Sequence, residues 1–202
     1  MITGYTGSDS DIVIPDFIIF DGAGKQSYAY CMTNDPEGNI YARLAPFAGI
    51  SAPQEGSGYA VYPVKEVGDQ AFAGNTVLRS VIFSNGIAGI GSGAFENCTS
   101  LKTIDLPDSL QSIGERAFFN CTALRGTLIL PASVNLLGSY AFYKCGFDGD
   151  LDLSCALTRI EEYTFFQCDG FVGTLTLPEN LSFIGDYAFA GCNRMGGTLE
   201  AC

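Results

Sequence analysis

A phenylalanine returns at nearly constant intervals along most of this chain, six times in register. The intervals between successive copies are 23, 23, 24, 23 and 24 residues. An aliphatic residue stands five positions before each copy. A period of about 20 to 29 residues that carries a strand pattern is typical of a solenoid, in which each coil stacks on the coil before it. The six phenylalanines are Phe72, Phe95, Phe118, Phe142, Phe165 and Phe189.

Each repeat contains a strand pattern and a return segment. In the copy that begins at Leu101, alternation sends Ile104 inward and Asp105 outward. A proline such as Pro107 then ends the strand, because proline cannot donate a hydrogen bond to the sheet. In the return segment 110–118, apolar residues stand at offsets 0, 3, 7 and 8, a spacing typical of one-sided helical or 3₁₀ structure. The sequence therefore predicts an α/β solenoid of about six coils, each of 23–24 residues, with parallel strands on one face and short helical or 3₁₀ returns on the other.

The chain divides into two predicted parts, residues 1–58 and 59–202. Residues 11–15 resemble the strand and proline of a repeat, so we expect an incomplete first coil that carries an insertion. Strand-favouring runs at Phe17–Phe20, Tyr28–Cys31 and Ile40–Leu44 are separated by turn-forming residues, and the last two predict a β-hairpin. Residues 45–58 are predicted to form a loop. A β-rich N-terminal cap that covers the open end of the first coil is one interpretation, and a ligand-binding or dimerising hairpin is the other.

Five of the eight cysteines stand three residues after the repeated phenylalanine, and Asn75 takes that place in the first copy. Cysteine packs as a small apolar group with a weak S–H donor. We therefore expect a column of buried free thiols, each bonded to a backbone carbonyl of the next coil. Disulfides between neighbouring coils and metal binding are the alternatives. Cys31, Cys155 and Cys202 lie outside this pattern.

Composition narrows the possible functions. The net charge of −12 disfavours nucleic acid and anionic lipid as partners, because both are bound through clustered Lys and Arg. The chain has no histidine, which excludes Ser-His-Asp and Cys-His catalysis and histidine-bound metals. Asp105, Asp150 and Asp152 could bind Ca²⁺ or support glycoside hydrolysis, but no D-x-D-x-D-G loop and no second catalytic feature accompanies them. We expect no enzyme activity, no cofactor and no metal. Apolar runs are too short to span a bilayer, so no membrane insertion is expected.

The repeat from Leu101 to Cys121 has the pattern L-x-x-I-x-L-P-x-x-L-x-x-I-G-x-x-A-F-x-x-C. This pattern resembles the BspA-like (Treponema-type) leucine-rich-repeat family over most of the chain. The resemblance implies a right-handed, curved α/β solenoid and no catalytic residues. It also implies a cell-surface or secreted protein that adheres to host or matrix proteins and to other cells. An extracellular location is therefore expected, with a signal peptide that has been removed from the polar N-terminus.

The outward residues of the strands form the candidate recognition surface, because a solenoid presents them as one large preformed face. Its acidic residues favour a protein or glycan partner with a basic patch. Two hypotheses follow: an adhesin-like interaction module that binds through this face, or a structural spacer that presents the N-terminal hairpin. The predicted partner-binding residues are Thr103, Asp105, Thr127, Ile129, Asp150, Asp152, Thr174 and Thr176.

The C-terminal residues 199–202 match residues 175–178 by register. The sequence therefore ends where a strand is expected to end. An uncovered strand edge invites pairing with another chain. We expect either a truncated chain or an end-to-end dimer through this strand.

Overall fold

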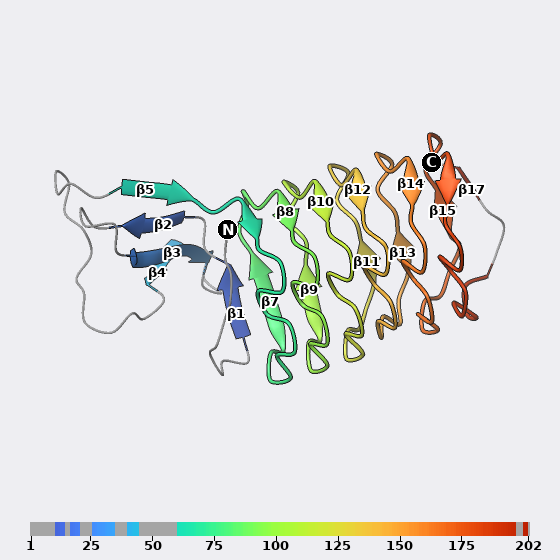
Figure 1. The fold of residues 1–202 in the computed structure, drawn as a ribbon, viewed down its shortest axis with the longest axis horizontal. Coiled ribbons are helices and arrows are strands. Elements are labelled where there is room, and N and C mark those ends of the chain that lie inside the picture. Colours follow the sequence, from blue (N-terminus) through green and yellow to red (C-terminus); the bar gives the residue numbers. More distant parts are fainter. Residues whose placement is uncertain are drawn as a thin grey trace.

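The computed structural model describes residues 11–14, 17–20, 26–34, 40–44, 60–196 and 200–201. Six repeats stack side by side, and we number the coils 1 to 6 by their phenylalanines (Figure 1). In each coil, one strand has side chains that alternate between the core and the outside. These strands lie along the same side of the stack, and we call them the strand column. The predicted register at the C-terminus is confirmed, because Thr176 pairs with Glu200 and Leu177 pairs with Ala201. The strand column consists of β1 (Asp11–Ile14), β7 (Ser80–Phe83), β9 (Thr103–Asp105), β11 (Leu128–Ile129), β13 (Leu151–Asp152), β15 (Thr176–Leu177) and β17 (Glu200–Ala201).

The return segments contain a second column of short parallel strands instead of helices. No residue in 60–196 is helical, so the predicted α/β class with helical or 3₁₀ returns was wrong in this respect. The spacing of the apolar residues correctly predicted which side chains are buried, namely Leu110, Ile113, Ala117 and Phe118. The backbone that carries them, however, is extended or forms turns and is not helical. The return column consists of β6 (Glu66–Val67), β8 (Gly89–Ile90), β10 (Ser112–Ile113), β12 (Leu136–Leu137), β14 (Arg159–Ile160) and β16 (Phe183–Ile184).

A series of tight turns, which we call the turn column, follows each return strand and explains why no helix forms. In coil 3, Arg116 and Asn120 have φ angles of 56° and 59°, in the left-handed region, which a right-handed helix cannot contain. Alternate amides point out of the turn: the Phe118 amide donates to the Ala141 carbonyl of coil 4 at 2.8 Å. The amides between them close turns within the coil, as when Phe119 donates to Arg116 at 3.0 Å. The turn column covers residues 70–74, 93–97, 116–120, 140–144, 163–167 and 187–191.

The core is built around the repeated phenylalanines. Neighbouring rings lie nearly parallel, with centroids 5.1–5.7 Å apart through all six coils. Phe95, Phe118, Phe142 and Phe165 are completely buried. Because parallel strands are about one strand spacing apart, identical positions in successive coils must stack directly on each other. The regular interval in the sequence is therefore the direct consequence of this packing.

The cysteine column is confirmed, with one change in direction. Each of the five thiols donates to the carbonyl of a phenylalanine in the preceding coil, at 3.0–3.2 Å. The prediction had placed this carbonyl in the next coil. All five are free thiols. In coil 1, Asn75 instead accepts hydrogen bonds from the Val77 and Leu78 amides within its own turn. The five cysteines are Cys98, Cys121, Cys145, Cys168 and Cys192.

The inserted strands form a separate antiparallel sheet at the N-terminal end of the stack (Figure 1). Its order is β4-β3-β2-β5, from β2 (Phe17–Phe20), β3 (Gln26–Asn34), β4 (Ile40–Leu44) and β5 (Ala60–Pro63). The predicted hairpin corresponds to β3 and β4, which pair from Tyr30 with Leu44 to Asn34 with Ile40. β5 follows the predicted boundary at residue 58, yet it pairs with β2. The predicted loop 45–58 lies outside the described residues, and the covering role of residues 1–58 stays a prediction.

Both strand columns are interrupted, whereas the turn column is continuous. Strand pairing is interrupted between β9 and β11, between β13 and β15, and between β12 and β14. Before the first two breaks the coils stay joined, because the Arg125 amide donates to the Lys102 carbonyl and the Val172 amide donates to the Gly149 carbonyl, both at 3.0 Å. The last break coincides with Glu161, which occupies a glycine position of the repeat. A Cβ atom at the equivalent Gly114 would lie 2.7 Å from the Ser92 amide nitrogen of the preceding coil, so a side chain here keeps the coils apart. The equivalent glycines are Gly68, Gly91, Gly114, Gly138 and Gly185.

Candidate binding surfaces

The strand column brings exposed isoleucines and carboxylates together in register. Ile82 pairs with Asp105, and Ile129 pairs with Asp152. Both isoleucines are more than half exposed, at 52% and 60%. Alternation explains their exposure, because their strand neighbours Val81 and Leu128 point into the core. The surface therefore offers two apolar spots, each beside a negative charge.

The predicted recognition residues do not form one continuous ladder. The break between β9 and β11 separates Asp105 from Ile129, and the break between β13 and β15 separates Asp152 from Thr176. The first break coincides with Gly126, an extra residue before β11 that has a φ of 85°.

All eight predicted residues lie on or beside the strand column, and seven of them are exposed. Thr176 is half-buried. Thr103 pairs with Ser80 of the preceding coil. Thr127 accepts a hydrogen bond from the Asp150 amide at 3.3 Å, which ties the start of β11 to the start of β13. Whether these residues bind a partner stays a prediction.

A second surface, which the sequence reasoning missed, is a partly exposed aromatic strip on the turn column. Tyr140, Tyr163 and Tyr187 stack with centroids 4.9 and 5.1 Å apart. A parallel row of rings stacks at 4.6 and 5.1 Å. Aligning the repeats would have shown it, because the aromatic residues fill two fixed positions, two before and one after the repeated phenylalanine. The second row consists of Phe119, Tyr143 and Phe166.

The ends and edges of the strip carry charges. The Arg116 guanidinium lies 3.9 Å from the centroid of Phe119, and it forms an ion pair of 2.6 Å with Glu96. Desolvation, followed by the neighbouring tyrosines and the carboxylates of Glu162 and Asp186, raises the pKa of Tyr163. The tyrosine hydroxyl therefore stays protonated at neutral pH and can both donate and accept hydrogen bonds.

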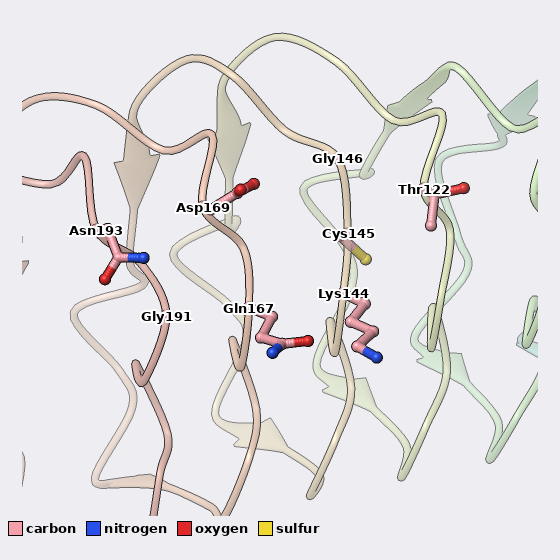
Figure 2. A pocket seen from close by; sticks show the side chains of 8 residues that line it. All are labelled: Thr122, Lys144, Cys145, Gly146, Gln167, Asp169, Gly191 and Asn193. Atoms are coloured by element: carbon pink, nitrogen blue, oxygen red, sulfur yellow. The ribbon is translucent and has the colours of Figure 1, made fainter.

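A shallow groove lies directly beside the strip. Figure 2 shows that its lining residues come from the turns of successive coils. Lys144 connects the two features, because its Nζ lies 5.4 Å from the centroid of the Tyr143 ring. The lining residues are Thr122, Lys144, Cys145, Gly146, Gln167, Asp169, Gly191 and Asn193.

The buried thiols do not form a reactive site. Burial raises the pKa of Cys98 to about 12 and that of Cys192 to about 11. Burial also raises the pKa of Cys121, Cys145 and Cys168. Since the thiolate is the nucleophile and the metal ligand, these side chains act as packing groups and hydrogen-bond donors. Within the described residues, no group of three His, Cys, Asp or Glu side chains could hold a metal ion. A helix able to cross a bilayer is likewise absent from this part of the chain.

Comparison with solved structures shows the same fold in three bacterial proteins. The T. pallidum leucine-rich-repeat protein is 23% identical, with a TM-score of 0.56, and the match covers 96% of this chain and 81% of that one. A leucine-rich-repeat protein from Bacteroides ovatus is 25% identical, with a TM-score of 0.53 and coverage of 84% and 51%. A leucine-rich cell surface protein from Faecalibacterium prausnitzii is 24% identical, with a TM-score of 0.54 and coverage of 96% and 56%. This chain thus spans about half the length of the last two.

No curated protein matches the chain. The model of the BspA-type leucine-rich-repeat region, however, matches residues 64–195 with six copies. These copies coincide with the six coils of the structure, and the match covers more than half of the chain. The chain therefore belongs to the BspA-type leucine-rich-repeat family.

Proposed function

We propose that this protein is a non-catalytic interaction module that binds a partner protein through the strand column. The observation that carries this proposal is the pairing of exposed isoleucines with carboxylates, Ile82 with Asp105 and Ile129 with Asp152. Protein interfaces combine an apolar centre with a polar, solvent-accessible rim. Negative charges beside the apolar spots would steer a partner with a basic patch and hold it in register.

Family membership supports this reading in a general way, because solenoids use their curved surfaces to bind other macromolecules. We further propose an extracellular or cell-surface location and an adhesin-like role. The location agrees with the description of the Faecalibacterium prausnitzii relative as a cell surface protein. A glycan bound on the strand column and a spacer that presents the β3–β4 hairpin are the competing functions, and the experiment below separates them from the proposal.

The test is a binding screen of the full chain against purified extracellular-matrix proteins and surface glycans at two salt concentrations. We expect a protein ligand whose binding weakens at high salt. The triple substitution Asp105→Asn, Asp150→Asn and Asp152→Asn should weaken it further, because it removes three negative charges on and beside the strand column and keeps the shape.

A matched control removes the same number of charges from the residues directly before the turn column: Glu115→Gln, Glu162→Gln and Asp186→Asn. Binding that is lost in the strand-column variant and kept in this control supports the proposal. Equal weakening in both variants would show a response to net charge alone and would refute a specific site. Binding that survives both variants but requires residues 26–44 would support the spacer, and a glycan ligand lost with the strand-column variant would replace the protein partner.

A further inference from the structure

The aromatic strip occurs only in coils 3 to 6, although the repeat would accept other residues. At the position two before the repeated phenylalanine, coil 1 has Gln70 and coil 2 has Gly93. At the position one after it, Ala73 occupies coil 1 and Glu96 occupies coil 2. These coils fold with the same turn hydrogen bonds as the others. Packing of the solenoid therefore does not explain the six aromatic side chains.

The backbone at the tyrosine row makes their presence more informative. Tyr140, Tyr163 and Tyr187 have φ angles of 58°, 55° and 56°. Residues with bulky side chains rarely adopt this left-handed conformation, which glycine enters without strain, as Gly93 does in coil 2. The same left-handed φ occurs at this position in coils 1 and 3, at Gln70 (54°) and Arg116 (56°), so the turn imposes the conformation and also accepts residues that are not aromatic.

The groove lies in the same coils as the strip, and two glycines are among its lining residues. Gly146 stands where coil 3 has Thr122, and Gly191 stands where coil 5 has Gln167. The other lining side chains include hydrogen-bond donors, hydrogen-bond acceptors and amide groups that can both donate and accept. One lysine and one aspartate, Lys144 and Asp169, balance each other in charge. The lining is thus suited to a ligand that carries many hydroxyl groups and no net charge.

We propose that the groove and the aromatic strip together bind a neutral, extended oligosaccharide chain that runs along the stack over coils 3 to 6. Tyr143 and Phe166 offer apolar ring surface to the C–H groups of the sugar, while Gln167 and Asn193 pair with its hydroxyls. The site is a shallow channel across successive turns, which suits a linear polymer better than a compact small molecule (Figure 2). None of the residues that line the groove belongs to the strand column, and the site does not depend on the proposed protein-binding function.

The test uses the full chain and neutral linear hexasaccharides: cellohexaose, xylohexaose, maltohexaose and chitohexaose. Hexa-arginine serves as a basic peptide probe, because Glu162 and Asp186 flank the strip. Binding is measured by titration calorimetry and by tyrosine fluorescence. The latter reports on the tyrosines because the chain has no tryptophan. We expect at least one hexasaccharide to bind saturably at millimolar concentration.

Two variants borrow residues that the chain itself uses at the same positions. Tyr163→Gln copies coil 1, and Phe166→Ala copies coils 1 and 6, so both should keep the fold. Each should weaken hexasaccharide binding by about tenfold, the effect of losing one good aromatic contact. The substitution of Asp105, Asp150 and Asp152 by asparagine should leave this binding unchanged, which separates it from binding at the strand column.

Three results would overturn the proposal. The first is that none of the four hexasaccharides binds. The second is that binding persists in both folded aromatic variants, with circular dichroism showing that the fold is intact. The third is that hexa-arginine alone binds and loses affinity in Tyr163→Gln, which would make the strip a site for basic peptides.

Discussion

The buried phenylalanine stack and the partly exposed aromatic strip have almost the same geometry but different distributions. Ring centroids are 5.1–5.7 Å apart inside and 4.6–5.1 Å apart outside. The inner stack runs through all six coils, whereas the outer rows are limited to coils 3 to 6. Packing imposes the spacing on any ring at a repeated position, but it requires a ring only where the core must be filled. An aromatic residue in the inner stack is therefore required by the fold. An aromatic residue in the outer strip is not required by the fold and is particular to this chain.

The largest effect that would distinguish the two stacks comes from truncating one ring in each. Phe118→Ala removes a completely buried ring between two others, and it should lower the free energy of unfolding by about 3–5 kcal/mol. Phe119→Ala removes the adjacent half-exposed ring and should cost no more than about 1.5 kcal/mol. Urea denaturation measures both. Equal costs would contradict the distinction between an obligatory inner stack and an optional outer one.

The spacing that both stacks share depends on glycine. Gly114→Ala places a methyl group 2.7 Å from the Ser92 amide nitrogen, so coils 2 and 3 must move apart. We expect a loss of about 1–3 kcal/mol in the free energy of unfolding, the usual cost of overpacking. Gly196→Ala is the matched control, because nothing lies within 4 Å of its added methyl group. If thermal or urea unfolding showed the two variants to be equally stable, close coil contact at Gly114 would be disproved.

Alkaline pH should affect the interior more gently. Burial raises the pKa of Cys98 from its usual value of 9.0 to about 12, so the folded protein keeps this proton where the unfolded chain releases it. The stabilisation is complete below pH 9 and is lost as the pH rises towards 12. Between these values, the free energy of unfolding should fall more steeply in the native chain than in Cys98→Ala, by up to about 1.4 kcal/mol per pH unit. Urea titrations at several pH values measure the slopes, and identical slopes would contradict the burial of this thiol.

Much of the fold could be predicted because packing repeats. The interval between phenylalanines predicted the stack, and the cysteine positions predicted the thiol column. The returns were misassigned because residues such as Leu110 and Ile113 show a spacing that fits a helix, while the strand at Ile113 pairs with β8 and β12 of the two neighbouring coils. Side-chain periodicity does not reveal where amides bond, and the left-handed backbone of Arg116 gives no signal in residue type.

The candidate sites were less predictable for the same reason. Alternation placed Asp105 and Ile129 outside correctly, but the breaks between strands depend on single residues such as Gly126. The aromatic strip was missed because its residues occupy positions that differ between coils, whereas the repeat pattern is defined by the positions that all coils share. Positions that change from coil to coil, such as Gln70 and Tyr163, carry the information about binding. Comparing the copies with each other would have found them.

The continuous turn column has a mechanical consequence. Three amide hydrogen bonds of 2.7–3.1 Å cross each of its five junctions, while pairing in the other two columns is broken between some coils. Under mechanical load, the turn column should resist extension, and the strand and return columns should separate first. The solenoid should therefore flex like a spring fixed along one side, changing the curvature of the strand column while the rings of the strip keep their separation. A partner that binds the strand column would meet a surface whose curvature can change. A ligand on the aromatic strip would meet rings whose separation stays constant.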